Sequence, residues 1–390
     1  AGRRRAGRPS PGAPRLVSPR PGAYVHVPYC AHRCSYCSFV AVTGKETEEA
    51  YFDALVAEAR SRAGEVAGPL DTVYFGGGTP SFARPENLGR VVSALREALG
   101  ITPDAEVTAE ANPDDLDGER LDGLLRAGVN RLSVGVQSLR DEELAPLERR
   151  HDADSALRAL ERVVRAGLRT SADLMIGIPG QSLETLLAAV AGIVATGVGH
   201  VSAYLLEIEK APRLVALRES RPELFAADEE AAARWEAVDA ACEAAGLPRY
   251  ETSNWARPGE ESRHNLKYWR REPVLALGVA AASFDGKARR TNSGSIPAYL
   301  AAIGARGSAF VAEETLEAEA ALREGVLLGL RTATGVGEKA FEAARATLGS
   351  SDRARLEDAF AAGLLARGEG RVRLTRAGVL LSNEVYSLLL

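Results

Sequence analysis

The chain has 390 residues, which suggests two or three domains at the usual size of roughly 100–200 residues each. Hydrophobic residues make up 46% and charged residues 26% of it, and these values exclude disorder, collagen or a coiled coil as a description of the whole chain. The net charge of −5 argues against a nucleic-acid binder that relies on bulk positive charge.

The first twenty residues differ in composition from the rest. They contain six arginines, four prolines and no acidic residue, and they lack the apolar stretch of a secretory signal peptide. The composition of residues 1–20 therefore predicts a disordered basic tail. The longest apolar run, residues 186–198, has 13 residues, whereas a membrane span needs about 18. We expect no membrane span and a cytoplasmic location.

From residue 21 to about 210, segments with strand character alternate with helical patterns. Strands are predicted at 24–27, 72–75, 106–109, 131–134, 170–176 and 200–205, and helices at 47–63, 86–98, 153–166 and 183–195. Such alternation indicates βαβ units and a parallel sheet wound by right-handed crossovers. The predicted fold class is α/β, a partial (β/α)6 TIM-like barrel.

The remaining sequence divides into two further parts. We predict the barrel over residues 21–245, a connecting segment rich in Asn, Arg and aromatic residues over 246–310, and a C-terminal domain over 311–390. The last domain is expected to be mostly helical and winged-helix-like, with a strand at 371–374 and a helix that Thr375 caps and that runs to residue 390. Its ten basic and twelve acidic side chains from residue 310 onward disfavour DNA binding.

Four cysteines are too few for a disulfide framework, and three of them lie within eight positions. Cys30, Cys34 and Cys37 follow the first predicted strand with Cys-x3-Cys-x2-Cys spacing, whereas Cys242 falls in a predicted helix and is expected to be a small buried residue. A structural zinc site would need a fourth ligand, and a redox Cys-x-x-Cys pair would leave Cys30 unexplained. An iron–sulfur cube normally takes four cysteines.

Three cysteines on a four-iron cube leave one iron open to a ligand. S-adenosylmethionine suits that position, because its amino and carboxylate groups can chelate the iron and place the sulfonium beside it. One-electron reduction would then split a C–S bond and release a deoxyadenosyl radical, with the cofactor supplying the chemistry and the protein holding it.

The cysteine segment resembles the radical S-adenosylmethionine superfamily, whose hallmark is this spacing with an aromatic residue before the third cysteine, here Tyr36. Further motifs occur in the order seen in the coproporphyrinogen dehydrogenase branch, which contains HemN and HemW. They are GGGTPS (76–81), EANP (110–113), GVNRLSVGVQS (128–138), RRH (149–151) and DLMIGIPGQ (173–181). The similarity runs from about Tyr24 to the terminal LLSNEVYSLLL, which is nearly the whole chain.

The resemblance implies roles for individual residues. It implies that the cysteines Cys30, Cys34 and Cys37 ligate a [4Fe-4S] cluster. The residues implied to contact the cluster-bound S-adenosylmethionine are Tyr24, Gly77, Gly78, Thr79 and Glu110. Those that match positions lining the same cavity, where HemN binds a second cofactor molecule, are Tyr36, Gln137, Arg149 and Asp173. Alternatively, Arg149 and Asp173 form an ordinary ion pair and Gln137 caps its loop.

Two features favour a haem carrier over a dehydrogenase within this branch. Phe39 stands where HemN-like enzymes have a further cysteine, as in HemW, and residues 264–269 (HNLKYW) resemble the HNxxYW signature associated with haem binding. His264 is therefore the candidate haem ligand, since histidine is the commonest proximal ligand of haem iron. A lone histidine is otherwise more often a hydrogen-bonded structural residue. The implied partners are haem, a haem-accepting respiratory protein and an electron donor.

Two stretches of the sequence differ from the motifs of this branch, and these differences affect which residue roles can be transferred to this chain. Residues 275–284 (LALGVAAASF) correspond to a stretch that usually reads GxGAHSF, so Ala280 and Ala282 replace a glycine and a histidine. Residues 205–214 (LLEIEKAPRL) lack the turn that usually follows the Ile-Glu pair, here Ile208 and Glu209. An oxygen-independent coproporphyrinogen dehydrogenase, which would oxidatively decarboxylate propionates, and a radical methyltransferase or cyclopropanase remain alternative functions.

Overall fold

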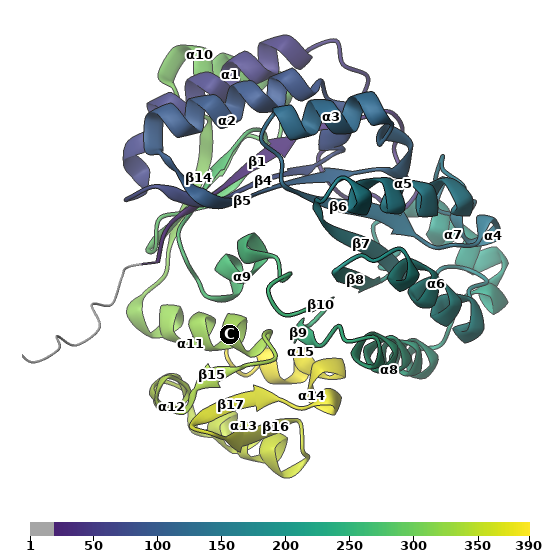
Figure 1. The fold of residues 1–390 in the computed structure, drawn as a ribbon. Helices are drawn as coiled ribbons and strands as arrows, with labels where there is room; N and C mark the ends of the chain where they lie inside the picture. Colours follow the sequence, from purple (N-terminus) through teal and green to yellow (C-terminus); the bar gives the residue numbers. More distant parts are fainter. Residues whose placement is uncertain (1–18) are drawn as a thin grey trace, which may run out of the picture.

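The computed structural model describes residues 19–390, so the tail predicted over residues 1–20 lies almost entirely outside the described residues. The predicted strand–helix alternation forms a curved sheet in which six parallel strands neighbour one another in chain order. These strands are β1 (Gly22–Val27), β4 (Leu70–Gly77), β5 (Ile101–Ala111), β6 (Arg131–Gln137), β7 (Arg169–Ile176) and β8 (His200–Leu205). Figure 1 shows the helices that follow these strands on the outer side of the sheet. The predicted partial barrel is confirmed.

The two faces of this sheet have different chemistry. On β6, Leu132, Val134 and Val136 are fully buried in the hydrophobic core beneath the outer helices. The alternate residues, including Arg131 and Ser133, lie on the inner face. Parallel strands are usually hydrophobic on both faces, so a polar inner face indicates a surface kept for solvent or a ligand.

Six helices form the outer layer of the barrel. They are α1 (Glu48–Ser61), α2 (Pro85–Leu99), α3 (Gly118–Arg126), α5 (Ala153–Arg165), α6 (Leu183–Ala195) and α8 (Asp228–Ala244). Asp152 and Ser182 cap α5 and α6 by accepting hydrogen bonds from the backbone N–H three residues on. Cys242 is fully buried on α8, as expected for a small core residue.

The segment predicted to connect the two domains, together with residues 311–315 of the predicted C-terminal domain, adds strands to both edges of the sheet, which reaches twelve strands. Beside β8 lie β10 (Asn254–Ala256) and β9 (Arg249–Glu251), both antiparallel to their neighbours. Beside β1 lie parallel β11 (Val274–Leu277) and then antiparallel β12 (Ala282–Phe284), β13 (Ala288–Asn292) and β14 (Phe310–Thr315). Between these two groups runs α9 (Arg263–Trp269), which begins at the Ser262 cap. The sequence did not predict these strands, because most of them are only three to five residues long and depend on pairing with distant strands.

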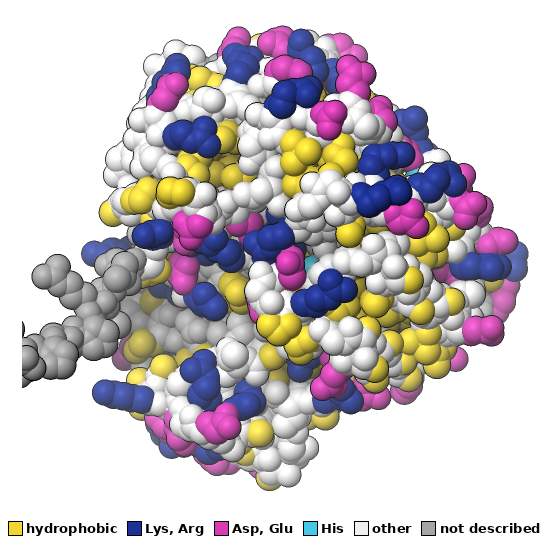
Figure 2. All heavy atoms as spheres, viewed as in Figure 1, with side chains coloured by type: hydrophobic (Ala, Val, Ile, Leu, Met, Phe, Trp, Pro, Cys, Tyr) yellow, Lys and Arg dark blue, Asp and Glu magenta, His cyan; other side chains and the backbone are white. Residues whose placement is uncertain are grey.

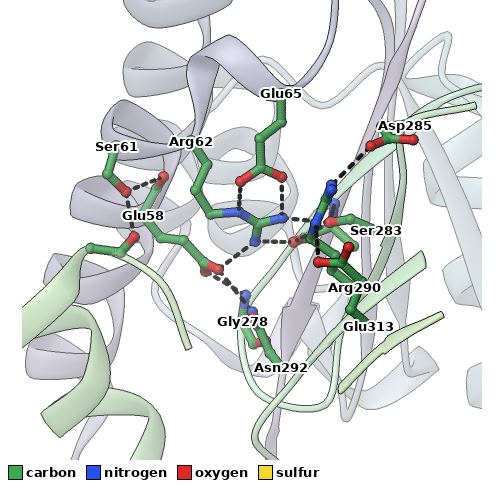
Figure 3. Close-up of polar contacts among 12 residues, drawn as sticks. Glu58, Ser61, Arg62, Glu65, Gly278, Ser283, Asp285, Arg290, Asn292 and Glu313 are labelled. Atoms are coloured by element: carbon green, nitrogen blue, oxygen red, sulfur yellow. Dashed lines mark hydrogen bonds and ion pairs between the residues drawn. The ribbon is translucent and has the colours of Figure 1, made fainter. Parts of the chain in front are cut away.

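A buried ion pair attaches the added strands to the barrel. Figure 3 shows Glu58 of α1 and Arg62, the residue after α1, directed at the loop and strands of residues 278–292. Glu58 accepts hydrogen bonds from the Gly278 amide at 2.9 Å and the Asn292 side chain at 2.8 Å. Arg62 donates to Glu58 at 2.6 Å. Because both charged groups are buried and hydrogen-bonded, the network fixes how the added strands pack on α1.

Ala280 occupies a backbone conformation that favours glycine, with φ of 56°. Left-handed backbone costs a residue with a Cβ roughly 1–2 kcal/mol. We expect Ala280→Gly to raise the free energy of unfolding by about 1 kcal/mol, after allowing for the greater freedom of glycine in the unfolded chain. Urea unfolding would measure this change. Ala282→Gly, on the extended strand β12, is the matched control and should lower stability by about 0.5–1 kcal/mol. Equal losses in both variants would contradict the interpretation.

The C-terminal domain combines five helices with a three-stranded antiparallel sheet, in the order β15-β17-β16. The elements are α11 (Ala318–Leu330), β15 (Val336–Gly337), α12 (Glu338–Ala346), α13 (Ser350–Ala361), β16 (Leu365–Gly368), β17 (Arg371–Leu374), α14 (Arg376–Leu380) and α15 (Ser382–Tyr386). The strand at 371–374 and the Thr375 cap are confirmed. The single helix predicted from there to residue 390 is wrong, because the backbone leaves helical geometry at Leu381.

The remaining elements are mostly short, apart from α10, which packs against α1. They are β2 (Tyr29–Cys30), β3 (Val42–Thr43), α4 (Asp141–Leu144), α7 (Pro212–Ser220), α10 (Ile296–Arg306) and the 3-10 turns η1 (Ala63–Glu65), η2 (Pro80–Phe82), η3 (Pro113–Asp115) and η4 (Pro222–Leu224). Within residues 19–390, no helix combines the length and the apolar character needed to cross a bilayer. Figure 2 shows basic and acidic side chains mixed over the visible face, without a continuous basic area.

Candidate cofactor site

The three cysteines lie in one loop at the carboxyl end of β1. Cys30 is buried at the end of β2, while Cys34 and Cys37 are partly exposed, and all three are free thiols. β2 pairs with β3, and His26 holds the far end of the loop by donating from Nε2 to the Val40 carbonyl at 2.8 Å. Across residues 19–390, no three Cys, His, Asp or Glu side chains gather closely enough to hold one metal ion. A [4Fe-4S] cluster does not need such a group, because each cysteine thiolate would bind a different iron atom of the cluster.

Two of the cysteine sulfurs accept hydrogen bonds from residues of other loops. The Thr79 hydroxyl donates to Cys30 Sγ at 3.3 Å, and Arg149 Nη1 donates to Cys34 Sγ at 3.4 Å. The same Arg149 nitrogen reaches the Tyr36 hydroxyl at 3.4 Å. Burial raises the pKa of the Cys30 thiol to about 11, so metal binding there must displace a proton. Thr79, Arg149 and Tyr36 therefore lie beside the cysteines.

Asn112 connects these groups, and sequence reasoning did not select it. Its side chain accepts from Arg149 Nη2 at 2.6 Å and donates to the Thr79 hydroxyl at 3.3 Å. Arg149 also donates to the Gly135 carbonyl at 2.7 Å, and its Nε is buried without a partner. The position of Asn112 within the EANP motif was the available signal. Asn112 orients the guanidinium toward the cysteine loop.

The glycine-rich loop is shaped by backbone packing. A Cβ on Gly78 would come within 2.7 Å of the Pro28 carbonyl carbon, and Gly77 has φ of 111°. The amides of Gly78 and Thr79 donate to the carbonyls of Val27 and Tyr29. Because these amides already donate hydrogen bonds within the protein, the loop does not offer them to a ligand. Its glycines instead allow a ligand to approach the backbone closely.

Glu110 lies at the centre of the inner face. It accepts hydrogen bonds from the Tyr74 hydroxyl at 2.9 Å and the Gly77 amide at 3.1 Å. Burial raises its pKa to about 7, and the nearby Asp173 carboxylate adds to this effect. Tyr24 stacks on Tyr74 with ring centroids 6.2 Å apart. A carboxyl group that titrates near neutrality can hold either a ribose hydroxyl or an ammonium group.

The raised pKa of Glu110 predicts a pH dependence of stability. Between its usual value of 4.5 and about 7, the carboxyl group ionises in the unfolded chain but stays protonated in the folded chain. Stability is therefore lost as pH rises through this interval, by at most about 3 kcal/mol. Urea unfolding of the ligand-free protein between about pH 5 and pH 8 should show wild type losing stability relative to Glu110→Gln. Parallel curves for the two proteins would show that Glu110 is ionised at low pH.

Gln137 and Asp173 both lie on the inner face, but neither forms the contact proposed as its structural alternative. Gln137 has φ of 68°, a strained conformation for a residue with a Cβ. Its Nε2 lies beside Gly135, where a Cβ would come within 2.9 Å of it. Asp173 accepts from the Ser133 hydroxyl at 3.1 Å and forms no ion pair with Arg149 among the described residues. Gln137 Nε2 and Arg149 Nη2 both lie near Gly135.

His264 lies deeper in the barrel than the cysteine loop. It stacks on Tyr74 with centroids 5.1 Å apart and contacts Thr72, two residues earlier on β4. Both ring nitrogens have hydrogen-bond partners: Nδ1 pairs with the Thr72 hydroxyl at 2.9 Å and Nε2 with the Tyr268 hydroxyl at 3.1 Å. Burial lowers its pKa to about 3, so the imidazole is neutral. In this conformation neither ring nitrogen is free to bind iron.

The residues present fit an iron–sulfur cluster and S-adenosylmethionine. Three thiols on one loop supply soft ligands, and the orphaned Nε of buried Arg149 indicates a polar partner not provided by the protein. The rim loops that the sequence analysis selected therefore converge at the carboxyl end of the strands, where ligands bind in barrels of this kind.

Comparisons with known proteins identify relatives over most of the chain. The Radical SAM superfamily model matches residues 24–191, and the HemN C-terminal domain model matches residues 316–381. The heme chaperone HemW of Bacillus subtilis (strain 168) is 34% identical over 374 residues, which is 94% of this chain and 98% of that protein. The heme chaperone HemW of Mycobacterium tuberculosis (strain ATCC 25618 / H37Rv) is 38% identical over 376 residues, or 95% and 94% of the two chains.

A solved structure shares the overall fold. Coproporphyrinogen III oxidase (HemN) from Escherichia coli superposes with a TM-score of 0.81 and covers 95% of this chain and 90% of its own. At 23% identity, this likeness shows the fold alone.

Proposed function

Since the chain belongs to the HemW family within the radical SAM superfamily, we propose that it binds haem and delivers it to a respiratory acceptor protein. Membership of the superfamily implies a [4Fe-4S] cluster and S-adenosylmethionine, and we propose Cys30, Cys34 and Cys37 as the cluster ligands. The observation that carries this assignment is the convergence of Thr79 and Arg149 on two of the three sulfurs. Such a cluster, when bound, supplies one electron to the sulfonium of S-adenosylmethionine.

The protein's own residues account for orientation at this site. Arg149 and Thr79 donate to sulfur, and hydrogen bonds to thiolates stabilise their charged form. Glu110, with Tyr74 and Tyr24 beside it, offers a carboxyl group and an aromatic wall to the cofactor. Tyr36 packs with the small apolar cluster of residues 208–214, which narrows access from that side. An external electron donor is part of this proposal.

Haem binding is assigned to the region of His264 and Tyr268. A neutral imidazole is the form that binds iron, and Tyr268, which covers Nε2, is 38% exposed. His264 can act as the ligand once the Tyr268 hydroxyl leaves Nε2. The Tyr268 hydroxyl would therefore compete with the iron.

A pair of variants tests His264 as the haem ligand. Tyr268→Phe keeps the ring but removes the competing hydroxyl, so it should strengthen haem binding several-fold, as expected from the loss of one hydrogen bond of about 1 kcal/mol. His264→Ala should abolish the imidazole–iron absorption spectrum. Anaerobic titration of the cluster-loaded protein, followed at the Soret band, gives both results. Unchanged spectra in His264→Ala would leave His264 with its structural role only.

A further inference from the structure

Arg131 is a buried cation without a protein partner on the inner face of the barrel. It is 2% exposed, its side chain forms no hydrogen bond or ion pair within residues 19–390, and its Nε is a buried atom without an acceptor. Unpaired buried charges are costly, and native structures normally pair them. An unpaired guanidinium facing the interior of a barrel therefore indicates a missing anion.

Thr108 provides a second, independent unpaired group at the same place. Its side chain is fully buried and its Oγ1 has no hydrogen-bond partner. Thr108 on β5 is the register partner of Arg131 on β6, so the two side chains lie next to each other on one face of the sheet. Since a hydroxyl and a guanidinium can both donate, one carboxylate would satisfy the two groups.

The neighbouring carboxylates of the protein already have other partners. Glu106 binds Arg169 and the backbone amide of His264. Glu110 binds the Tyr74 hydroxyl and the Gly77 amide, and Asp173 binds two serine hydroxyls. None of these carboxylates accepts a hydrogen bond from Thr108 or Arg131, although the Arg131 charge partly offsets the burial that raises the pKa of Asp173.

Two tyrosines that belong to the inner side of the barrel are partly exposed to solvent. Tyr204, which lies on the inner face of β8, is 43% exposed, as is Tyr268 at 38%. We propose that Thr108 and Arg131 form a carboxylate-binding subsite that receives a propionate of haem. This inference rests on the function proposed above. The methionyl carboxylate of an S-adenosylmethionine molecule has the same chemistry and is the competing source.

The test compares haem with its dimethyl ester, which lacks both carboxylates. Cluster-loaded, full-length protein is titrated anaerobically as wild type, Arg131→Gln, Thr108→Val and the control Arg165→Gln, an exposed arginine on α5. We expect Arg131→Gln to weaken haem binding about tenfold or more and Thr108→Val to weaken it several-fold. Binding of the diester should be unchanged in all variants. Equal losses for haem and diester, or no loss for haem, would overturn the subsite.

A parallel titration separates the two carboxylate sources and the proposed function. If Arg131→Gln weakens S-adenosylmethionine but not its decarboxylated analogue, and leaves haem binding unchanged, the propionate assignment is overturned. If wild type binds no haem at all, the proposed function fails, and the same cofactor titration then shows whether the carboxylate subsite itself exists.

Thermal unfolding of ligand-free Arg131→Met distinguishes a ligand subsite from a structural residue. Removing an unpaired buried charge should leave the unfolding midpoint equal to or above that of wild type. A clearly lower midpoint would show that Arg131 stabilises the empty fold through a protein or water partner, which would overturn the proposal. Thr108→Val, which is nearly isosteric, keeps the binding test valid if Arg131 variants fold poorly.

Discussion

Cys34→Ala is expected to lose essentially all cluster iron and acid-labile sulfide after anaerobic reconstitution. Three thiolates are the smallest set that holds a cube with one open iron, so removing one leaves two ligands and a labile cluster. Cys34 also accepts the hydrogen bond from Arg149, which ties the loop to the barrel rim. Iron and sulfide analysis, with the absorption near the visible charge-transfer bands, measures the result.

Cys242→Ala is the matched control for this experiment. Cys242 is fully buried on α8 and outside the cysteine loop, so its replacement should cost some stability but no iron. If Cys34→Ala kept the full iron and sulfide content, the proposed ligand set would be wrong.

Glu58→Ala is expected to lower the free energy of unfolding by about 3–5 kcal/mol, because it leaves the Arg62 guanidinium buried without its charge partner. Glu58 also accepts from the Gly278 amide at 2.9 Å and the Tyr299 hydroxyl at 2.7 Å, and both groups would lose their acceptor. Urea unfolding followed by circular dichroism measures this loss.

Glu65→Ala is the matched control for Glu58→Ala, because Glu65 also forms an ion pair with Arg62. The Glu65 side chain is 25% exposed and pairs with Arg62 from the outer side, so its loss should cost about 1 kcal/mol or less. Equal costs for the two variants would contradict the view that the Glu58 ion pair anchors the added strands.

The six parallel strands between residues 22 and 205 could be predicted because each is apolar enough to be recognised and is followed by a helical period, whereas the parallel strand β11 was not predicted. The cysteine loop and the glycine-rich loop could be located from spacing and strand order. The edge strands could not be predicted, since β9–β10 and β12–β13 are three to five residues long and depend on pairing with distant strands. Their stability comes from tertiary contacts such as the Glu58–Arg62 network.

Side-chain environments were less predictable than loop positions. His264 was selected from a motif, but only the structure shows that Thr72 and Tyr268 occupy both ring nitrogens. Arg131 belongs to the GVNRLSVGVQS motif, yet the absence of a partner within residues 19–390 depends on side chains from other strands. The helix predicted after Thr375 is interrupted at Leu381, and no proline lies there; Gly378, three residues earlier, was the only local signal within this segment.

The measurement that tests the proposed function most directly is an anaerobic haem titration of the cluster-loaded wild-type protein, followed at the Soret band. A haem carrier should bind one haem per chain saturably and should release it to an acceptor without chemical change. Absence of specific haem binding, together with conversion of coproporphyrinogen to a product lacking two carboxyl groups, would contradict the carrier and establish the dehydrogenase.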